Sequence, residues 1–346
     1  MIPPSVGVRA PRPLLLTGLL ASLYALNGRS SALTLKMSGS SAGPPAAATA
    51  PKVIDSHLHV WASSSEAAKS YPYAEGQDPP PSLIDRASTS ELLKIMDDAG
   101  VDGALIVQPI NHKYDHSYVT DAVRAHPDRL KGMLLHDPAL PPERAVSRLE
   151  ELTLDGYVGV RFNPYLWPEG AKMSEEGGCG LAVYKRCGEL KMPVGVMCFK
   201  GLELHYDDIV RLIESSPDTA LILDHLGFTG LDERGDAAFE QLLSLAKYPN
   251  VVVKVSALFR VAGPGSDPYP HNGVRTRRFV PLLEAFGADR LMFGTDFPYV
   301  LEQEGSYGGA TGTVSSWATT ESERASLMGG TAERLFGPWG SVGKSS

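Results

Sequence analysis

Cysteine is scarce in this chain of 346 residues, which contains only Cys179, Cys187 and Cys198. No two of them form a CxxC pair, so the sequence indicates a reducing compartment and excludes a disulfide framework. Positive charge is also in the minority, since the formal net charge is −8. This charge balance argues against nucleic acid as the main partner.

Acidic residues are absent from positions 1–50, although the segment carries four basic ones. Its apolar run, Pro13–Leu26, is short for a membrane span. Acid-free leaders rich in Ser and Arg are typical of targeting segments. We therefore expect a transit peptide, or a signal followed by a transit peptide, that sends the protein to an organelle, foremost a plastid. The alternative is an untargeted disordered tail on a cytoplasmic protein. In neither case do we expect the mature form to bind a membrane.

Two signatures of common enzyme classes are missing as well. The chain has no GxSxG motif, which argues against a serine hydrolase. The first strand-like run continues into His-Leu-His-Val-Trp and not into a glycine-rich turn. An open dinucleotide-binding sheet would need that turn, so the sequence argues against this fold.

A regular alternation of short β-branched runs and longer amphipathic stretches begins at Lys52. Such alternation predicts parallel strands joined by crossover helices. Eight units in this length match a (β/α)₈ barrel, the TIM barrel. We expect one barrel domain over residues 51–338 and a disordered tail over 339–346. The predicted strands are Val53–His59, Gly103–Gln108, Leu130–Asp137, Tyr157–Asn163, Pro193–Phe199, Ala220–His225, Val251–Ser256 and Leu291–Asp296.

The first predicted strand ends in His57-Leu58-His59. Residues two apart on a strand point to the same side, so both imidazoles are expected in the barrel mouth, close enough to share one metal ion. Neutral imidazole is a common ligand of zinc and related metals. The alternative is a pair of structural histidines that hydrogen-bond to nearby groups.

Polar residues also end the sixth and eighth predicted strands. His225 follows an apolar run, and Asp296 ends a buried strand, where a carboxylate needs a partner, a metal or water. Residues at the carboxyl ends of barrel strands are typically catalytic. We expect site roles for both, against the alternatives of a core histidine and a helix N-cap. Asp224, next to His225, is expected to point the other way and to pair with a neighbour.

Other strand ends supply candidates for binding the substrate. Arg161 offers either a forked donor for a substrate carboxylate or an ion pair that braces the barrel. Lys254, inside the barrel, needs a carboxylate and is expected to be structural. The remaining candidates at strand ends are Gln108, His136, Lys200 and Ser256.

The pattern of motifs resembles the amidohydrolase superfamily in its amidohydrolase-related branch. The resemblance rests on VIDSHLHVW, GVRFNPY, LILDHLG, VVVKVSALF, RLMFGTDFP and MGGTAERLFG, and it spans roughly Lys52 to Gly337. It implies a deformed barrel and hydrolysis at a carbonyl, usually with a divalent metal. By position, the resemblance makes His57 and His59 the first-strand ligands. Asp296 becomes the residue that binds metal or takes a proton from water, with His225 as the sixth-strand histidine.

The sequence departs from the metal-rich members of that superfamily at strand five. PVGVMCFKG has no histidine where many members place a ligand, and no lysine on strand four could be carboxylated. The pattern is more similar to the lactonase-like subgroup, some of whose members work without metal. We therefore expect at most one divalent ion, zinc or manganese, with metal-free catalysis as the alternative.

The expected function is that of a hydrolase acting on a small anionic substrate such as a lactone, with water activated by Asp296. The alternatives are a non-oxidative decarboxylase of the same branch and a barrel that binds a metabolite without turnover. The sequence leaves open whether the protein forms a homo-oligomer.

Overall fold

The computed structural model describes residues 51–340, which form one eight-stranded parallel barrel. Its strands follow one another around the barrel in chain order, as a (β/α)₈ fold requires. All eight predicted strands are confirmed, although each ends earlier than the sequence suggested. The strands are β1 Ile54–Leu58, β2 Gly103–Val107, β3 Leu130–Leu135, β4 Tyr157–Phe162, β5 Val194–Val196, β6 Leu221–Leu223, β7 Val251–Val255 and β8 Leu291–Phe293.

The barrel closes where the first strand meets the segment that follows the last. A parallel bridge joins Leu58 to Phe297. The amide of Asp296 donates to the carbonyl of His57 at 2.9 Å, and the amide of His59 donates to the carbonyl of Phe297 at 2.7 Å. The closing seam therefore fixes the backbones of the three predicted metal ligands to one another.

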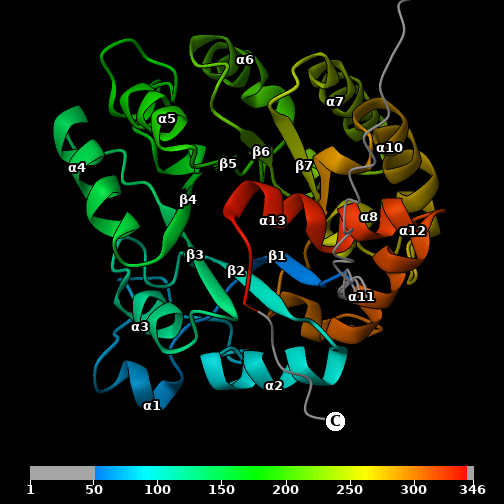
Figure 1. Ribbon diagram of the computed structural model, residues 1–346, viewed down its shortest axis with the longest axis horizontal. Helices are drawn as coiled ribbons and strands as arrows, with labels where there is room; N and C mark the ends of the chain where they lie inside the picture. The colour runs from blue at the N-terminus through cyan, green and yellow to red at the C-terminus, as the bar shows by residue number, and fades with distance from the viewer. Residues whose placement is uncertain (1–50, 341–346) are drawn as a thin grey trace, which may run out of the picture. The chain divides into compact units, whose positions relative to one another are not determined.

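Helices surround the barrel, as Figure 1 shows. Local signals set their limits: α2 begins after Ser88, whose hydroxyl caps the amide of Glu91, and ends at Gly100 with φ of 67°. The helices are α1 Ser64–Ala67, α2 Thr89–Ala99, α3 Ser117–Ala125, α4 Pro142–Thr153, α5 Cys179–Leu190, α6 Tyr206–Ser215, α7 Glu233–Ser244, α8 Leu258–Ala262, α9 Asn272–Val274, α10 Val280–Phe286, α11 Ser306–Trp317, α12 Glu321–Ala325 and α13 Thr331–Phe336. None of the helices in the described part of the chain is long and apolar enough to span a membrane.

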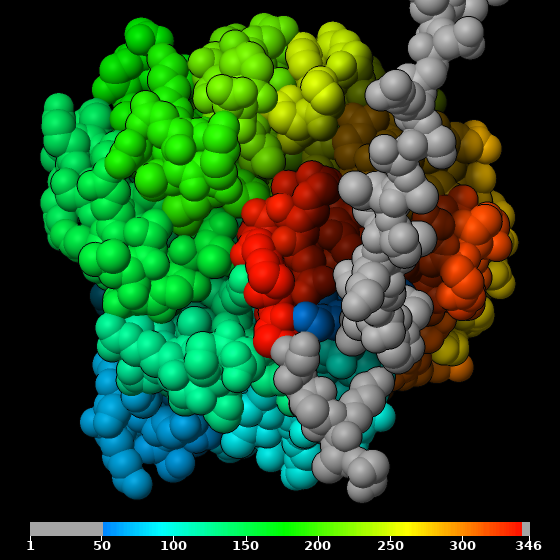
Figure 2. All heavy atoms as spheres, in the orientation of Figure 1, coloured from blue at the N-terminus to red at the C-terminus, as the bar shows by residue number. Residues whose placement is uncertain are grey.

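The amino-terminal end of the barrel is sealed by apolar side chains. Figure 2 shows α13 filling the middle of this face. Phe336 and Trp339 pack in one cluster with the strand residues Ile54, Leu105, Val107, Met133, Ile222, Val252 and Met292. Gly103 leaves room for the Trp339 ring, because a Cβ atom there would lie 2.3 Å from it.

The predicted start of the disordered tail at residue 339 is wrong. Trp339 is only 2% exposed, and its indole N–H donates to the carbonyl of Ala104 at 3.3 Å. The amide of Gly340 donates to the carbonyl of Asp128. These two residues belong to the barrel because they plug its end. Residues 341–346 and the predicted leader at 1–50 lie outside the described residues.

Candidate active site

A cavity of about 430 Å³ opens at the carboxyl end of the barrel. The loops that follow the strands form its walls, which is where barrel enzymes bind substrates. Its lining comprises His59, Gln108, Pro109, Ile110, Asn111, Leu135, Arg161, Asn163, Tyr165, Met197, Phe199, Lys200, His225, Phe228, Arg260, Asp296 and Tyr299.

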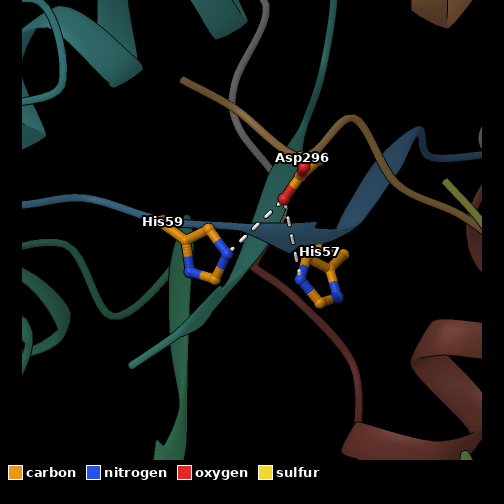
Figure 3. Close-up of side chains that lie close together, drawn as sticks. All are labelled: His57, His59 and Asp296. Atoms are coloured by element: carbon orange, nitrogen blue, oxygen red, sulfur yellow. Dashed lines mark ion pairs between the residues drawn. The ribbon is translucent and has the colours of Figure 1, made fainter. Parts of the chain in front are cut away.

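Three histidines surround one oxygen of Asp296 at the base of this cavity. The Nε2 atoms of His59 and His225 lie 3.5 and 3.7 Å from Oδ1 of Asp296. Nε2 of His57 lies 4.0 Å from the same oxygen. Figure 3 shows the rings of His57 and His59 each turning a nitrogen toward the carboxylate. The structure thus brings together the four residues that the strand ends singled out.

Each imidazole is held at its other nitrogen. Nδ1 of His59 contacts the carbonyl of Val107 at 2.8 Å, and Nδ1 of His225 contacts the hydroxyl of Ser256 at 2.7 Å. A carbonyl only accepts, so His59 donates from Nδ1 to Val107. Such outer partners orient metal-ligating imidazoles.

The third imidazole belongs to a buried charge cluster inside the barrel. Nδ1 of His57 lies 3.1 Å from Oδ1 of Asp224. Lys254 lies 3.3 Å from the same Asp224 oxygen and 3.2 Å from Nδ1 of His57, while Arg161 lies 3.2 Å from Oδ2. Burial would raise the pKa of Asp224, but these neighbours hold it well below its ordinary value, so the carboxylate is ionised.

The expectation that Asp224 points away from the site is therefore wrong, although it does pair with neighbours. Strict alternation fails here because β6 ends at Leu223 and the chain then turns sharply. His225 has φ of 52° and Leu226 has φ of 51°, so Asp224 and His225 both reach the barrel interior. Lys254 has the carboxylate partner that its buried position demanded.

Left-handed backbone conformations concentrate around the site. Side chains disfavour positive φ, at a cost of about 1–3 kcal/mol each, and such residues cluster at active sites. Five of the nine non-glycine residues with positive φ in the described chain lie within five residues of the end of β6, β7 or β8, namely His225, Leu226, Phe228, Ala257 and Asp296. The backbone is therefore bent where the two proposed catalytic side chains enter the cavity.

A buried carboxylate behind the site fixes this backbone. Asp55 is fully buried and accepts hydrogen bonds from the amides of His57 and Thr295 at 3.1 and 3.0 Å. It also accepts from the Thr295 hydroxyl at 2.6 Å. Burial raises the pKa of Asp55 to about 6, against the lowering effect of these bonds. Asp55 thus ties β1 to the residue before Asp296.

Arg260 on α8 completes the surroundings of Asp296, and the sequence analysis missed it. Its Nε donates to Oδ2 of Asp296 at 2.8 Å, and its guanidinium lies 4.7 Å from the ring of Tyr299. Burial would raise the pKa of Asp296, but His225, His59 and Arg260 lower it below its ordinary value. Burial also lowers the pKa of His225 to about 3, so a neutral imidazole faces an ionised carboxylate.

Arg260 escaped detection because it lies beyond the end of its strand. Strand-end position was the only signal used, and Arg260 is separated from β7 by the turn at Ala257. A search for charged residues in the loops that follow strands would have found it. Tyr299, which follows Asp296 by three residues, was missed for the same reason.

The predicted substrate-binding residues divide into two groups. Arg161, Gln108 and the candidate Lys200 line the cavity. Arg161 also pairs with Asp224. Its position is therefore compatible both with binding a substrate carboxylate and with an ion pair that braces the barrel. Gln108 is anchored by its amide nitrogen, which donates to the carbonyls of Lys113 and Asp115 at 3.1 and 2.8 Å.

His136 and Ser256 do not line this cavity, so the structure does not support their predicted contact with substrate. Leu135 faces the cavity, and its neighbour His136 therefore points to the outer side of β3, where it packs against Phe162 and Trp167. Ser256 is fully buried behind His225 and orients that ring.

The residues at the cavity base fit a single divalent metal ion. One ligand atom each from His57, His59 and Asp296 lies within 4.8 Å of the others. Nε2 of His57 is buried and has no hydrogen-bond partner among the described residues, which is costly for a polar atom unless a ligand binds it. Three protein ligands of this kind leave a coordination position open.

Several known proteins with similar sequences or folds are hydrolases of small molecules. The chain is 27% identical over 296 residues to a 4-sulfomuconolactone hydrolase of Hydrogenophaga intermedia, covering 82% of this chain and 88% of that one. In fold it is similar to a probable 2-pyrone-4,6-dicarboxylic acid hydrolase of Acinetobacter baumannii with citric acid bound, with a TM-score of 0.67 and 21% sequence identity. The match covers 83% of this chain and 99% of that one.

A second similar structure is an amidohydrolase of Burkholderia multivorans with bound zinc, with a TM-score of 0.61 and 22% sequence identity. The match covers 82% of this chain and 99% of that one. Residues 54–337, which include the whole barrel and the four convergent side chains, match the amidohydrolase family model. This chain is therefore a member of the amidohydrolase family and a hydrolase.

Proposed function

We propose that this protein opens the ring of a small anionic lactone by adding water to its ester carbonyl. The observation that carries the proposal is the convergence of three imidazole Nε2 atoms on Oδ1 of Asp296, at the base of a cavity with cationic walls. The lactone hydrolases among its relatives support this substrate class.

Asp296 is the residue proposed to take a proton from the attacking water. It is ionised, and Oδ1 is the oxygen that faces the cavity base, because Arg260 occupies Oδ2. The bond to Arg260 also fixes the orientation of the carboxylate. A positioned base of this kind contributes about 10²–10⁴-fold to the rate of a hydrolysis.

The histidines are proposed to act on the carbonyl side of the reaction. His57, His59 and Asp296 would hold one divalent ion, zinc or manganese, with His225 as a fourth ligand or as an acid above the substrate. When bound, the ion supplies a Lewis acid for the carbonyl and lowers the pKa of water beside it. Without an ion, the imidazoles would act as hydrogen-bond donors to the carbonyl oxygen.

Arg161 is proposed to hold an acidic group of the substrate. It lines the cavity while Asp224 fixes its Nε side. A guanidinium can bind two partners at once because it presents five donors on a planar fork. The pair with Asp224 therefore preorganises Arg161 and leaves donors for a carboxylate.

The lactone hydrolases among the sequence relatives favour hydrolysis over the decarboxylase alternative, although one structure of similar fold is a 5-carboxyvanillate decarboxylase. The resemblance to this branch implies that its decarboxylases usually supply a histidine after strand five, whereas here β5 is followed by Met197, Cys198, Phe199 and Lys200. We retain hydrolysis as the proposed reaction.

The proposal is tested by incubating purified protein with a panel of acidic lactones while its metal content is measured by elemental analysis. We expect ring opening of at least one acidic lactone and at most one divalent ion per chain. Absence of turnover across the panel, in both the metal-loaded and the chelated protein, would reject lactone hydrolysis. Two tightly held ions per chain would reject the single-ion site.

We also propose that residues 1–50 direct the protein to an organelle, foremost a plastid. The acid-free composition and the Ser- and Ala-rich stretch of the segment support this. A fusion of residues 1–50 to a fluorescent protein should enter plastids in plant or algal cells. A fusion of residues 51–100 is the control, and cytoplasmic fluorescence from both would reject the proposal.

A further inference from the structure

The three imidazoles of the site differ in what their Nδ1 atoms contact. Nδ1 of His59 faces the carbonyl of Val107, which only accepts hydrogen bonds. Nδ1 of His225 faces the hydroxyl of Ser256, which can donate or accept. Of the three, His57 is the ring whose Nδ1 has both a pure acceptor and a pure donor beside it. These two partners therefore compete to determine which nitrogen of His57 carries the proton.

The competing partners of His57 are almost equally close. Oδ1 of Asp224 lies 3.1 Å from Nδ1, and Nζ of Lys254 lies 3.2 Å from the same atom. Lys254 and Asp224 also pair with each other at 3.3 Å, and all three side chains are fully buried. A carboxylate only accepts hydrogen bonds and an ammonium only donates them. The single Nδ1 atom can satisfy one of these neighbours but not both.

Each choice gives His57 a different chemistry at Nε2, the atom that faces the cavity base. Burial lowers the pKa of His57 well below its ordinary value, so the ring is neutral and carries one proton. With the proton on Nδ1, the ring donates to Asp224, and Nε2 has a lone pair for a metal ion. With the proton on Nε2, Nδ1 accepts from Lys254, and Nε2 can donate to a substrate carbonyl.

Without a metal ion, the contacts favour the proton on Nε2. Lys254 then donates to Nδ1, and the Nε2 proton faces the ionised Asp296, whose Oδ1 lies 4.0 Å away (Figure 3). One contact is unfavourable, because the Nδ1 lone pair faces Asp224. With the proton on Nδ1, only the bond to Asp224 is favourable, while the proton faces Lys254 and the Nε2 lone pair faces Asp296. A cation beside Nε2 reverses this last contact and favours the proton on Nδ1.

We infer that Lys254 is a positioning residue that controls the tautomer of His57, and thereby whether this ring donates a proton in the metal-free protein or offers a lone pair to a metal ion. When an ion binds, the ring keeps one proton but carries it on Nδ1, where Asp224 accepts it. The inference rests on the proposed function only in placing the ion at His57, His59 and Asp296.

The test uses the full-length protein with isotope-labelled histidine nitrogens, which are observed by NMR. Protonated and unprotonated ring nitrogens have separate shifts, and the His57 signals are identified by their absence from His57→Gln. In the chelated wild type we expect the proton on Nε2, and added zinc should move it to Nδ1. An unprotonated Nδ1 would identify Lys254 as its partner, because Lys254 is the donor within hydrogen-bond distance of that atom among the described residues.

Lys254→Met keeps the length of the side chain and removes the donor. We expect this variant to carry the His57 proton on Nδ1 even when chelated. Calorimetry should show zinc binding about 10- to 100-fold tighter than in the wild type, because a charge-assisted contact no longer opposes the metal-binding tautomer. Lys131→Met is the matched control and should behave as the wild type. Lys131 is also a strand lysine, but it donates to the carbonyls of Phe336 and Gly337 at the opposite end of the barrel.

A proton on Nδ1 in the chelated wild type, or on Nε2 in chelated Lys254→Met, would overturn the inference. Tighter zinc binding by Lys254→Met with an unchanged tautomer would also overturn it, because Lys254 would then act only through its charge. If Lys254→Met does not fold, the chelated and zinc-loaded spectra of the wild type decide. None of these measurements needs turnover, so a failure of lactone hydrolysis would reject only the proposed reaction.

Discussion

The two ends of the barrel are built from the same eight strands but differ in what they bury: one end buries apolar side chains and the other buries charges. At the amino-terminal end, aliphatic side chains of the strands pack with Phe336 and Trp339 into an apolar plug. At the carboxyl end, the interior holds ionised carboxylates, imidazoles and residues with positive φ. Buried charges and bent backbone reduce stability, so this end is organised for function at the expense of stability. The apolar plug at the amino-terminal end stabilises the fold and offsets the destabilising charges at the carboxyl end.

The largest expected effect is on activity at the carboxyl end. Asp296→Asn keeps the size of the side chain but removes the base and its charge. Hydrolysis should fall about 10²–10⁴-fold, while the melting temperature stays the same or rises, because a buried charge has been removed. Steady-state kinetics and thermal melting check both parts. A variant that keeps its rate would remove Asp296 from the proposed chemistry.

The next largest effect is expected at the opposite end. Trp339→Ala should lower the free energy of unfolding by about 3–5 kcal/mol, because a buried ring and its bond to Ala104 are lost. Activity of the folded protein at low temperature should not change. Leu154→Ala is the control, since Leu154 is 88% exposed. Urea unfolding that shows equal stability for both variants would refute the apolar plug.

A smaller effect is expected for Ser256, a residue at the carboxyl end that acts through another side chain. Ser256→Ala removes the partner of Nδ1 of His225. Loss of such an outer partner lowers metal affinity or activity about 10- to 100-fold. Chelator competition and kcat measure this, with Ser244→Ala as a control whose hydroxyl contacts Tyr206 outside the site. Matching values for the two variants would mean that His225 needs no orienting partner.

The smallest effect concerns a histidine outside both ends. His116 is buried, and its Nε2 accepts the amide of Leu135. Burial lowers its pKa to about 4. The unfolded chain therefore binds more protons, so stability from this residue is complete above about pH 6.5 and is lost as the pH falls toward 4.

At pH 5 the loss attributable to His116 is about 2 kcal/mol. The free energy of unfolding of His116→Asn should consequently fall less steeply between pH 7 and pH 5 than that of the wild type, whatever its stability at pH 7. Urea unfolding at several pH values measures this slope. Parallel pH profiles would show that His116 is not the group responsible.

Sequence periodicity was sufficient for the fold and for the side chains that extend straight from strands. Alternation placed His57 and His59 on one face, and strand ends located His225 and Asp296. Alternation failed where the backbone leaves the strand. The positive φ of His225 brings Asp224 into the interior, which no count along an ideal strand can predict.

Other residues were misjudged because their surroundings come from distant parts of the chain. His136 follows the last residue of β3, Leu135, which takes the inward position. Location near a strand end was therefore insufficient without a check of which face each residue occupies. Trp339 follows the last helix in a glycine-rich stretch typical of a tail, and only the barrel end that it fills explains its burial. Arg260 reaches Asp296 from a separate short helix.

The most direct test of the central claim is the product formed from an acidic lactone in water enriched in heavy oxygen. Mass spectrometry should show a product heavier than the lactone by one labelled water, with the label in the newly formed carboxylate. That outcome is specific to attack of water on the ester carbonyl. A product that has lost carbon dioxide, or recovery of the unchanged lactone from the metal-loaded protein, would contradict it.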